Sequence, residues 1–453
     1  MNEKVAVVSL GCAKNLICSE QMLNLLDEAG YRIVDRPEDA DVAVVNTCGF
    51  IESAKMEAID NILSLGELKK EGKLKKLLVA GCLSQRYREE LAKEMPEIDG
   101  MLGVGSYADI AEAVKKVLAG ESVSRFGDIN APVDEIGRIV STGPGWAYLR
   151  IAEGCDNRCA YCAIPDIRGR YRSRPFESVV SEAEALAASG VRELIVIAQD
   201  ITRYGTDLYG RRRLHELLRA FSEIDGIEWI RLHYLYPDEI DDELIGEIRD
   251  NPKVLKYLDI PIQHINDRVL KRMNRRGTGE EIRVLFRRLR AEIPGLVLRT
   301  SLIAGLPGEG EAEFEELCDF LREAKIERAG VFPFSPEEGT PAAKMEYADT
   351  ETANRRAELL TDIQDQIMDD FDRSRHGKAV RLLCEGFDAE TLLYWGRSFA
   401  ESPDIDGRIL FAGAEAVPGE FYDVVISGES GGELVGTVLP DTVKGTKEYE
   451  PAE

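Results

Sequence analysis

"EGCDNRCAYCAIP", residues 153–165, carries three of the nine cysteines of the chain. Cys155, Cys159 and Cys162 stand on one short stretch, four and then three residues apart. A zinc site needs a fourth ligand, and no second Cys-x-x-Cys or histidine pair follows nearby. A disulfide would leave one of the three cysteines unpaired. Three thiolates on one loop instead fit a metal cluster in which one metal keeps a position free for another ligand.

Strand-like apolar runs that alternate with helical patterns follow this loop along the chain. Amphipathic helices such as residues 176–190 separate the runs. A complete α/β barrel has eight strand–helix units, so six units predict a partial (β/α)6 barrel with its chemistry at the carboxyl ends of the strands. The cysteine loop directly follows the first strand and is therefore expected at that end. The expected strands are residues 146–152, 192–198, 227–235, 254–260, 296–305 and 328–334.

The first part of the chain also alternates strands and helices, which predicts an open parallel α/β domain. The strand-like runs 4–11, 41–47 and 75–81 are each followed directly by a cysteine. Because the carboxyl ends of parallel strands share one edge of a sheet, these cysteines are expected to meet in space. The alternative is that they are core residues, a common fate of cysteine. The three cysteines are Cys12, Cys48 and Cys82.

Two further segments complete the expected organisation. Residues 124–144 contain glycine and proline without a clear period, which predicts a linker. Short strands separated by turn residues after the last long helix predict a small antiparallel β-barrel. The predicted units are therefore an N-terminal domain (1–123), a partial barrel with a trailing helix (145–375) and a C-terminal barrel (376–453).

The charge balance indicates a basic partner. The chain has 83 acidic and 57 basic residues and a net charge of −26. Proteins that bind nucleic acids usually present a basic face, so direct RNA binding is disfavoured, although Arg211, Arg212 and Arg213 form one candidate basic patch. An acidic protein is better suited to a basic protein partner.

Cysteine usage and the start of the chain favour a cytoplasmic protein. Residues 1–11 lack the pattern of a signal peptide, and no apolar run approaches the roughly 20 residues of a membrane span, so no membrane partner is expected. Nine unevenly spaced cysteines then indicate reduced thiols. Cys18, Cys318 and Cys384 are interpreted as core residues. His264 follows the fourth barrel strand and fits an active-site role and a structural role equally.

The Cys-x-x-x-Cys-x-x-Cys loop at the mouth of a partial barrel resembles the radical S-adenosylmethionine (SAM) superfamily. The resemblance implies a four-iron cluster that cleaves SAM to a 5′-deoxyadenosyl radical, which abstracts hydrogen from an unreactive carbon. It also implies that Tyr161 lies along the adenine and that Gln199 and Asp200 contact the methionine end. Gly305 and Glu309, in "IAGLPGE", are implied to approach the cofactor, although a tight turn explains the glycines almost equally well.

The whole arrangement is similar to the methylthiotransferase family. The resemblance rests on "SLGCAKN", "NTCGFI", "AGCLSQR" and "FSPEEGTP" in addition to the cysteine loop. It implies SAM as cofactor, an electron donor such as flavodoxin or ferredoxin, and two four-iron clusters. The radical cluster would be held by Cys155, Cys159 and Cys162, and an auxiliary cluster that carries the inserted sulfur by Cys12, Cys48 and Cys82. Ala13 departs from the family pattern, which has a proline there.

Family members modify either an adenosine of tRNA near the anticodon or the β-carbon of an aspartate in small-subunit ribosomal protein 12. Three segments resemble the ribosomal-protein branch: "RLHYLYP" (231–237), "YLDIPIQHI" (257–265) and "GRSFAESPDIDG" (396–407). Methylthiolation of that aspartate is therefore expected, with tRNA as the alternative substrate. A rival of another class is a non-catalytic iron–sulfur or zinc protein with fully coordinated metals. Within the last segment, Glu401, Asp404 and Asp406 are expected to dock the substrate.

Overall fold

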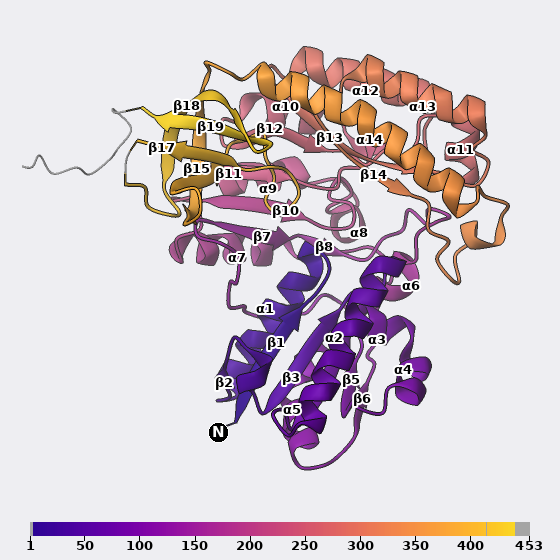
Figure 1. Ribbon diagram of the computed structural model, residues 1–453, viewed down its shortest axis with the longest axis vertical. Coiled ribbons are helices and arrows are strands. Elements are labelled where there is room, and N and C mark those ends of the chain that lie inside the picture. The colour runs from indigo at the N-terminus through magenta and orange to yellow at the C-terminus, as the bar shows by residue number, and fades with distance from the viewer. Residues whose placement is uncertain (1–2, 414, 440–453) are drawn as a thin grey trace, which may run out of the picture.

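The structure of the protein, a computed structural model, describes residues 3–413 and 415–439. Figure 1 shows an N-terminal α/β unit at the bottom, a half-barrel above it, and a small β-barrel against one side of the half-barrel. Residues 440–453 of the predicted C-terminal domain lie outside the described residues.

The N-terminal unit contains a parallel sheet of six strands in the order β2-β1-β3-β4-β5-β6. Neighbouring residues of β3 face opposite sides of this sheet, because successive side chains of a strand alternate. Val42 and Val44 pack on one side, and Ala43 and Val45 on the other. The strands are β1 (Lys4–Ser9), β2 (Arg32–Ile33), β3 (Val42–Thr47), β4 (Lys76–Gly81), β5 (Gly100–Leu102) and β6 (Val123–Arg125).

Helices cover both faces of this sheet. α1 (Ala13–Glu28) and α5 (Ile110–Leu118) pack on one face, and α2 (Glu52–Lys70) and α4 (Arg88–Glu94) pack on the other. The short α3 (Cys82–Arg86) begins directly after β4. The predicted open parallel α/β architecture is confirmed.

The half-barrel is a second parallel sheet, with the order β14-β13-β12-β11-β10-β7. All six predicted strands are present, and within the described residues its edge strands β7 and β14 do not pair with each other. A two-stranded ribbon, β8 and β9, flanks the cysteine loop. The strands are β7 (Trp146–Arg150), β8 (Ala152–Glu153), β9 (Arg172–Ser173), β10 (Glu193–Ile197), β11 (Trp229–Leu232), β12 (Val254–Asp259), β13 (Val297–Ala304) and β14 (Arg328–Pro333).

The helices of the half-barrel pack mainly on its outer face, where they bury the largest apolar cluster of the molecule (Figure 1). In the described part of the chain, no helix has the length and apolar character needed to cross a membrane. The helices are α6 (Ile164–Arg168), α7 (Phe176–Ala188), α8 (Thr206–Tyr209), α9 (Leu214–Ser222), α10 (Asp242–Asp250), α11 (Asp267–Arg272), α12 (Gly279–Glu292), α13 (Glu311–Ala324) and α14 (Thr350–Arg373).

The C-terminal unit is a closed barrel with the strand order β15-β16-β17-β19-β18. The predicted small barrel is confirmed, with one difference: β17 and β19 pair in parallel, whereas the other pairs are antiparallel. The chain leaves β17, forms β18 beside β15, and returns as β19 beside β17. The strands are β15 (Ala379–Asp388), β16 (Leu393–Arg397), β17 (Ile409–Ala412), β18 (Phe421–Ser430) and β19 (Glu433–Val438).

The segment that follows β16, residues 398–406, packs against the side of the half-barrel sheet that faces away from the outer helices. Arg231 donates hydrogen bonds to the carbonyl oxygens of Ser398 (3.2 Å) and Phe399 (2.7 Å). The Tyr257 hydroxyl donates to Asp406 at 2.6 Å. This segment is therefore a plug that fills the concave face of the open barrel.

The plug corrects the predicted docking surface. Glu401 is 1% exposed and pairs with Arg328 at 3.1 Å and with Arg375. Burial would raise the pKa of the Glu401 carboxyl, but Arg375 and Arg328 outweigh burial and hold that pKa at about 2. The Asp406 side chain is 6% exposed. Only Asp404 is exposed, so the expectation of one shared acidic surface is wrong.

A buried carboxylate joins the two barrels. Glu193, at the start of β10, is 0% exposed and accepts from Arg231 Nε at 2.7 Å and from Arg397 Nη2 at 2.8 Å. Arg231 belongs to the half-barrel and Arg397 to the C-terminal barrel. Because a buried guanidinium needs an anionic partner, this contact depends on the charge of Glu193.

We expect Glu193→Gln to destabilise the protein by roughly 3–5 kcal/mol at similar volume, because the buried Arg231 loses its counter-charge and Arg397 is left with Glu385. Unfolding in denaturant, followed by tryptophan fluorescence, measures the change. Asp250→Asn, which removes one partner of an exposed pair with Arg249, is the matched control and should shift the midpoint little. An equal, small effect of both substitutions would contradict the role of Glu193.

Candidate active site

Residues 154–163 form the loop that carries Cys155, Cys159 and Cys162. Backbone hydrogen bonds to distant segments hold this loop in place. The N–H of Cys155 donates to the Gly169 carbonyl at 3.1 Å, and the N–H of Ala160 donates to the Met273 carbonyl at 2.8 Å. None of the chain's nine cysteines forms a disulfide. The three thiols of the loop are therefore free to bind metal.

The other three predicted cysteines follow neighbouring strands of the N-terminal sheet, at its carboxyl edge. Gly11 has a φ of +86°, and a Cβ at this position would lie 2.6 Å from Cys48 Cβ. Only glycine therefore permits this approach of the loop before Cys12 to Cys48. Cys12 is exposed, Cys48 is half-buried and Cys82 is buried. Three core cysteines would all be buried, whereas the exposure of these three differs.

Burial raises the pKa of Cys82 and Cys155 to about 11. Cys12 is exposed as a residue, but desolvation of its sulfur still acts to raise the pKa of the thiol. The positive charges of Lys14 and Arg168 outweigh this effect, and the pKa of Cys12 is lowered. Metal binding would replace the thiol protons, because the thiolate is the ligand.

The free thiols of both triplets are the donor type that a four-iron cluster binds. Within the described ranges, no three His, Cys, Asp or Glu side chains converge on one metal ion. A four-iron cluster does not require such convergence, because each thiolate binds a different iron. Each triplet supplies three thiols that form no disulfide, and free thiols are the ligands that such a cluster needs.

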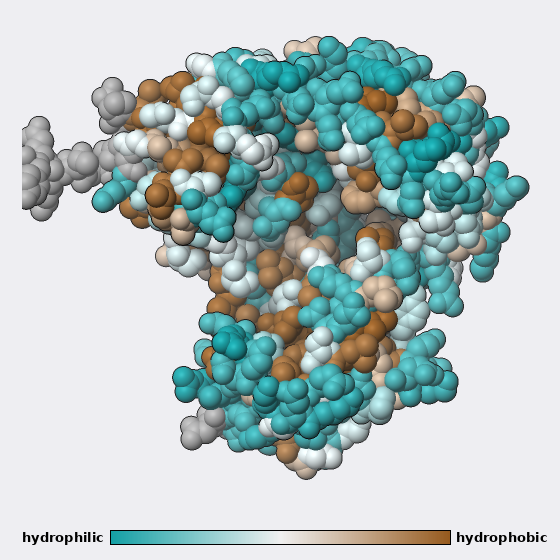
Figure 2. Space-filling model, in the orientation of Figure 1, coloured by the Kyte–Doolittle hydropathy of each residue, from teal (hydrophilic) through white to brown (hydrophobic). Residues whose placement is uncertain are grey.

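A cavity of about 490 Å³ lies between the N-terminal unit and the half-barrel. The N-terminal unit lines it with residues 50–53, which follow Cys48, and the half-barrel lines it with Tyr161, Gln263 and Phe332, among others. Figure 2 shows the surface hollowed where these two units meet, with hydrophobic residues along the rim. A largely apolar cavity with a few polar groups is typical of an active site.

Gln263 stands out within this cavity wall. Its φ is +70°, a strained value for a residue other than glycine. Its N–H donates to the Ser301 carbonyl at 2.9 Å, and its carbonyl accepts from the Ile303 N–H at 2.9 Å. These bonds hold the strained backbone against β13, so that the Gln263 side chain lines the cavity.

Glu153 anchors the base of the cysteine loop. It accepts from Arg150 and Arg168 at 2.9 Å each, from Gln199 Nε2 at 2.7 Å and from the Gly154 N–H at 3.1 Å. Burial would raise the pKa of this carboxyl, but Arg168 and Arg150 hold it at about 2. Gln199 Oε1 is buried and has no partner within the described residues, which fits a hydrogen-bond donor on a bound cofactor.

Tyr161 belongs to the same loop, and Asp200 lies beside it. Asp200 is 1% exposed and accepts from Asn157 Nδ2 at 2.9 Å, and burial raises its pKa. The Tyr161 hydroxyl accepts from Arg275 at 3.1 Å, while the ring lines the cavity. Their contact with the cofactor stays a prediction.

Gly305 and Glu309 make contacts within the fold. Glu309 accepts from the Gly305 N–H and from Arg356 of α14, each at 2.9 Å. His264 is 0% exposed, and its Nε2 lies 3.2 Å from Glu309. These contacts favour the structural role for His264. The approach of Gly305 and Glu309 to the cofactor stays a prediction.

Glu337, in the "FSPEEGTP" segment, ties the half-barrel to the N-terminal unit. Its carboxylate lies 3.2 Å from Lys55 Nζ and 2.9 Å from Arg86 Nη1. Arg86 also donates to the carbonyl of Gly49 at 2.9 Å. One buried carboxylate therefore holds the loop that carries Cys48 against the half-barrel.

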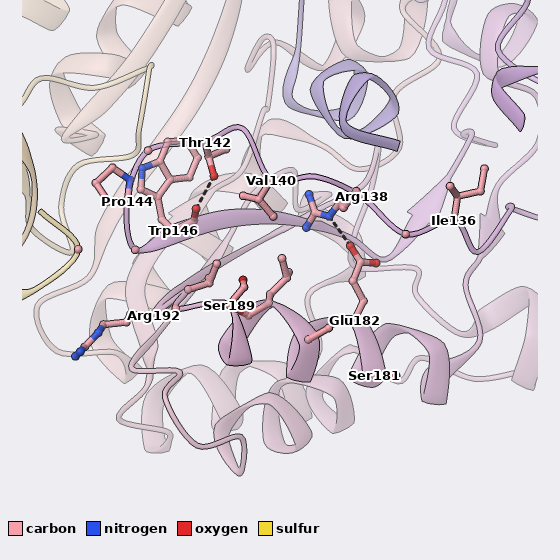
Figure 3. Close-up of a pocket in the computed structure, with 18 of the residues that line it drawn as sticks. Ile136, Arg138, Val140, Thr142, Pro144, Trp146, Ser181, Glu182, Ser189 and Arg192 are labelled. Carbon is pink, nitrogen blue, oxygen red and sulfur yellow. Dashed lines mark hydrogen bonds and ion pairs between the residues drawn. The ribbon is translucent and has the colours of Figure 1, made fainter. Parts of the chain in front are cut away.

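A groove of about 1130 Å³ lies elsewhere, between the linker, α7 and the C-terminal barrel. Figure 3 shows Arg138 paired with Glu182, and Thr142 bonded to Trp146. Arg192 at its end pairs with Glu420 at 2.7 Å. These charged groups already have protein partners, so this groove is a seam between units rather than a site.

Four residues that organise the site have no role among the predictions made from the sequence. Glu153 and Glu337 lie inside quoted motifs but were not assigned a role, and Gln263 lies inside a third. Arg168 carried no signal beyond its position six residues after Cys162. The proximity of Glu153 to the cysteine loop was the one usable signal.

Comparisons with known proteins agree with this organisation. Three family models match: uncharacterized protein family UPF0004 over residues 4–103, the radical SAM superfamily over 149–321, and the TRAM domain over 377–439. The structure of the radical SAM methyltransferase TsrM from Kitasatospora setae, with tryptophan and a SAM analogue bound, aligns with a TM-score of 0.57. The two sequences are 14% identical, and the alignment covers 82% of this chain and 90% of that chain. The fold and the cysteine loop define an enzyme of the radical SAM superfamily, which uses SAM and a [4Fe–4S] cluster.

Full-length relatives define the family. The ribosomal protein uS12 methylthiotransferase RimO of Acetivibrio thermocellus is 48% identical over 98% of this chain and 100% of its own length. The enzyme of the same name from Pelobacter propionicus is 48% identical over 97% of this chain and 99% of its own length. The chain belongs to the RimO family of methylthiotransferases.

We expect Glu337→Gln to loosen the contact between the Cys48 loop and the half-barrel, because Lys55 and Arg86 lose a buried counter-charge worth about 1–3 kcal/mol. Hydrogen exchange measured by mass spectrometry should become faster in residues 49–53 and 83–87. Glu338→Gln is the matched control, since the Glu338 side chain is exposed. Unchanged exchange in Glu337→Gln would show that the carboxylate does not hold the two units together.

Proposed function

We propose that this protein methylthiolates the β-carbon of an aspartate in ribosomal protein uS12. The observation that carries the proposal is a cavity lined by residues 50–53, which follow Cys48, and by Tyr161, which precedes Cys162, so that each of the two units contributes a segment next to one of its cysteines. Relatives that match nearly the full length are named for this activity. A non-catalytic metal protein would not need such a cavity between its two units.

We assign one four-iron cluster to each triplet. Cys155, Cys159 and Cys162 would hold the radical cluster, and the triplet at the N-terminal sheet edge, Cys12, Cys48 and Cys82, would hold the auxiliary cluster that carries the sulfur. The supporting observation is that each set consists of free thiols at the carboxyl edge of a parallel sheet. When bound, the radical cluster and SAM supply the abstraction of hydrogen from an unactivated carbon.

The polar side chains beside the radical loop would orient SAM. Gln199 has an unsatisfied buried oxygen that suits the amino group of the cofactor. Tyr161 belongs to the same loop, Asp200 lies beside it, and Gly305 and Glu309 shape the end of β13. In this assignment, Tyr161 lies along the adenine.

The cavity would receive the target aspartate. Phe50 and Ile51 on one wall and Phe332 and Phe334 on the other exclude water from the reacting carbon. Ser301 and Gln263 also line the wall, and no hydrogen bond of their side chains is found within the described residues. They are the groups best placed to bind a carboxylate that enters.

The charge of −26 supports a basic protein as the partner, because opposite charge accelerates encounter. With Glu401 and Asp406 buried, Asp404 is the one member of the predicted acidic set that remains a candidate for docking. We further propose a flavodoxin or ferredoxin as electron donor and a cytoplasmic location, where ribosomal proteins are found.

We expect about eight irons per chain after anaerobic reconstitution, four for each cluster. Replacing Cys155, Cys159 and Cys162 with Ala should halve the iron and abolish formation of 5′-deoxyadenosine, because the radical cluster is lost. Cys48→Ala should retain 5′-deoxyadenosine formation while sulfur insertion stops. An intact protein with only four irons, or loss of cleavage in Cys48→Ala with the fold intact, contradicts separate roles.

The substrate is tested by anaerobic turnover with purified uS12 and, separately, with unmodified tRNA. We expect the mass of uS12 to rise by one methylthio group, and the rate at low substrate concentration to fall as salt is added, because salt screens the attraction between opposite charges. A methylthio group that appears on tRNA and never on uS12 would establish the alternative substrate.

A further inference from the structure

Arg168 ends the short helix that follows the radical cysteine loop. α6 (Ile164–Arg168) begins two residues after Cys162, and the Arg168 side chain is 3% exposed. On the apolar side, Ala163 and Ile167 pack against Cys82 of the other triplet. The single turn of α6 therefore follows Cys162 of one triplet in the chain and packs against Cys82 of the other.

The guanidinium of Arg168 reaches the N-terminal unit directly. Its Nη2 donates to Cys82 Sγ at 3.4 Å and to Asn15 Oδ1 at 3.2 Å. Its Nη1 donates to Glu153 Oε2 at 2.9 Å. A planar guanidinium can serve both sides at once because its five N–H groups point in fixed, diverging directions.

We propose that Arg168 is a positioning residue for the auxiliary cluster, to which it donates an N–H···S hydrogen bond through Cys82. This rests on the proposed function only in taking Cys82 as a cluster ligand. Reduction adds negative charge to a cluster, and hydrogen bonds to its sulfurs stabilise that charge, so Arg168 raises the reduction potential of the auxiliary cluster. Its bond to Glu153 fixes this donor relative to the radical loop.

Arg150 provides a matched comparison. It is 5% exposed and donates to the same Glu153 oxygen at 2.9 Å. It also donates to Cys18 Sγ at 3.2 Å, and no contact with Cys82 is found among the described residues. The two arginines therefore share burial and the Glu153 contact, and differ in the hydrogen bond to the cluster ligand.

The first test is potentiometry of the reconstituted full-length chain, followed by electron paramagnetic resonance. Arg168→Lys keeps the positive charge, but the lysine ammonium lacks the planar guanidinium that donates hydrogen bonds to Cys82 and Glu153 at the same time. We expect a more negative potential for the auxiliary cluster in Arg168→Lys, and an unchanged potential in Arg150→Lys. A folded Arg168→Lys protein with the wild-type potential, or equal shifts in both variants, overturns the proposal.

The second test leaves Arg168 in place and so does not depend on whether its variants fold. The chain with Cys155, Cys159 and Cys162 replaced by Ala is produced with ¹⁵N-labelled arginine and reconstituted, so that only the auxiliary cluster contributes to the signal. Pulsed electron paramagnetic resonance of the reduced protein should detect ¹⁵N coupling from an arginine. A cluster without this coupling overturns the role of Arg168 alone. If no cluster forms in this variant, the two-cluster assignment itself fails, and the Arg168 proposal fails with it.

Discussion

The carboxylate of Glu153 lies where the N-terminal unit and the half-barrel meet. The arginines that balance its charge also bind the N-terminal unit, so the charge favours keeping the two units together. It is compensated by Arg150 and Arg168, which also contact Cys18 and Cys82 of the N-terminal unit. If the units separated, the arginines would lose partners on one side. A buried ion network of this kind adds little net stability, because desolvation offsets the attraction, but it strongly favours one geometry. That geometry sets the distance between the two cysteine edges.

A second buried network sets the other boundary of the half-barrel. An incomplete barrel leaves the inner face of its strands uncovered, and here the plug of residues 398–406 covers it. Arg231, Tyr257 and His233 reach from the strands into the plug. The C-terminal barrel is therefore part of the core of the half-barrel, held through Glu193, rather than a separate module on a flexible connection.

Sequence periodicity predicted the strands of both parallel sheets and the place of the cysteines after them, because strand ends and cysteines are local signals. It missed the short strands β2, β5 and β6 of the N-terminal sheet, which have two or three residues and no measurable period. The prediction that Glu401 and Asp406 belong to an exposed docking surface was also wrong. Charged residues near one another in sequence usually indicate an exposed face, but here the partners that bury them, such as Arg328 and Tyr257, are far away in the chain. Pairings of this kind leave no periodic pattern to detect.

The acidity of the chain and the character of its cavity act at different stages of substrate recognition. Surface charge acts on an approaching basic protein over a Debye length of about 8 Å at physiological ionic strength. Inside the cavity, most of the wall is apolar, and the carboxylates there are neutralised: Glu52 pairs with Lys55, and Glu337 pairs with Lys55 and Arg86. Radical chemistry depends on exclusion of water and fixed geometry rather than on a charged group beside the reacting carbon. Selection of one aspartate must therefore depend on the shape of the cavity and on the few unpaired polar groups of its wall, while the net charge affects how often a basic partner arrives.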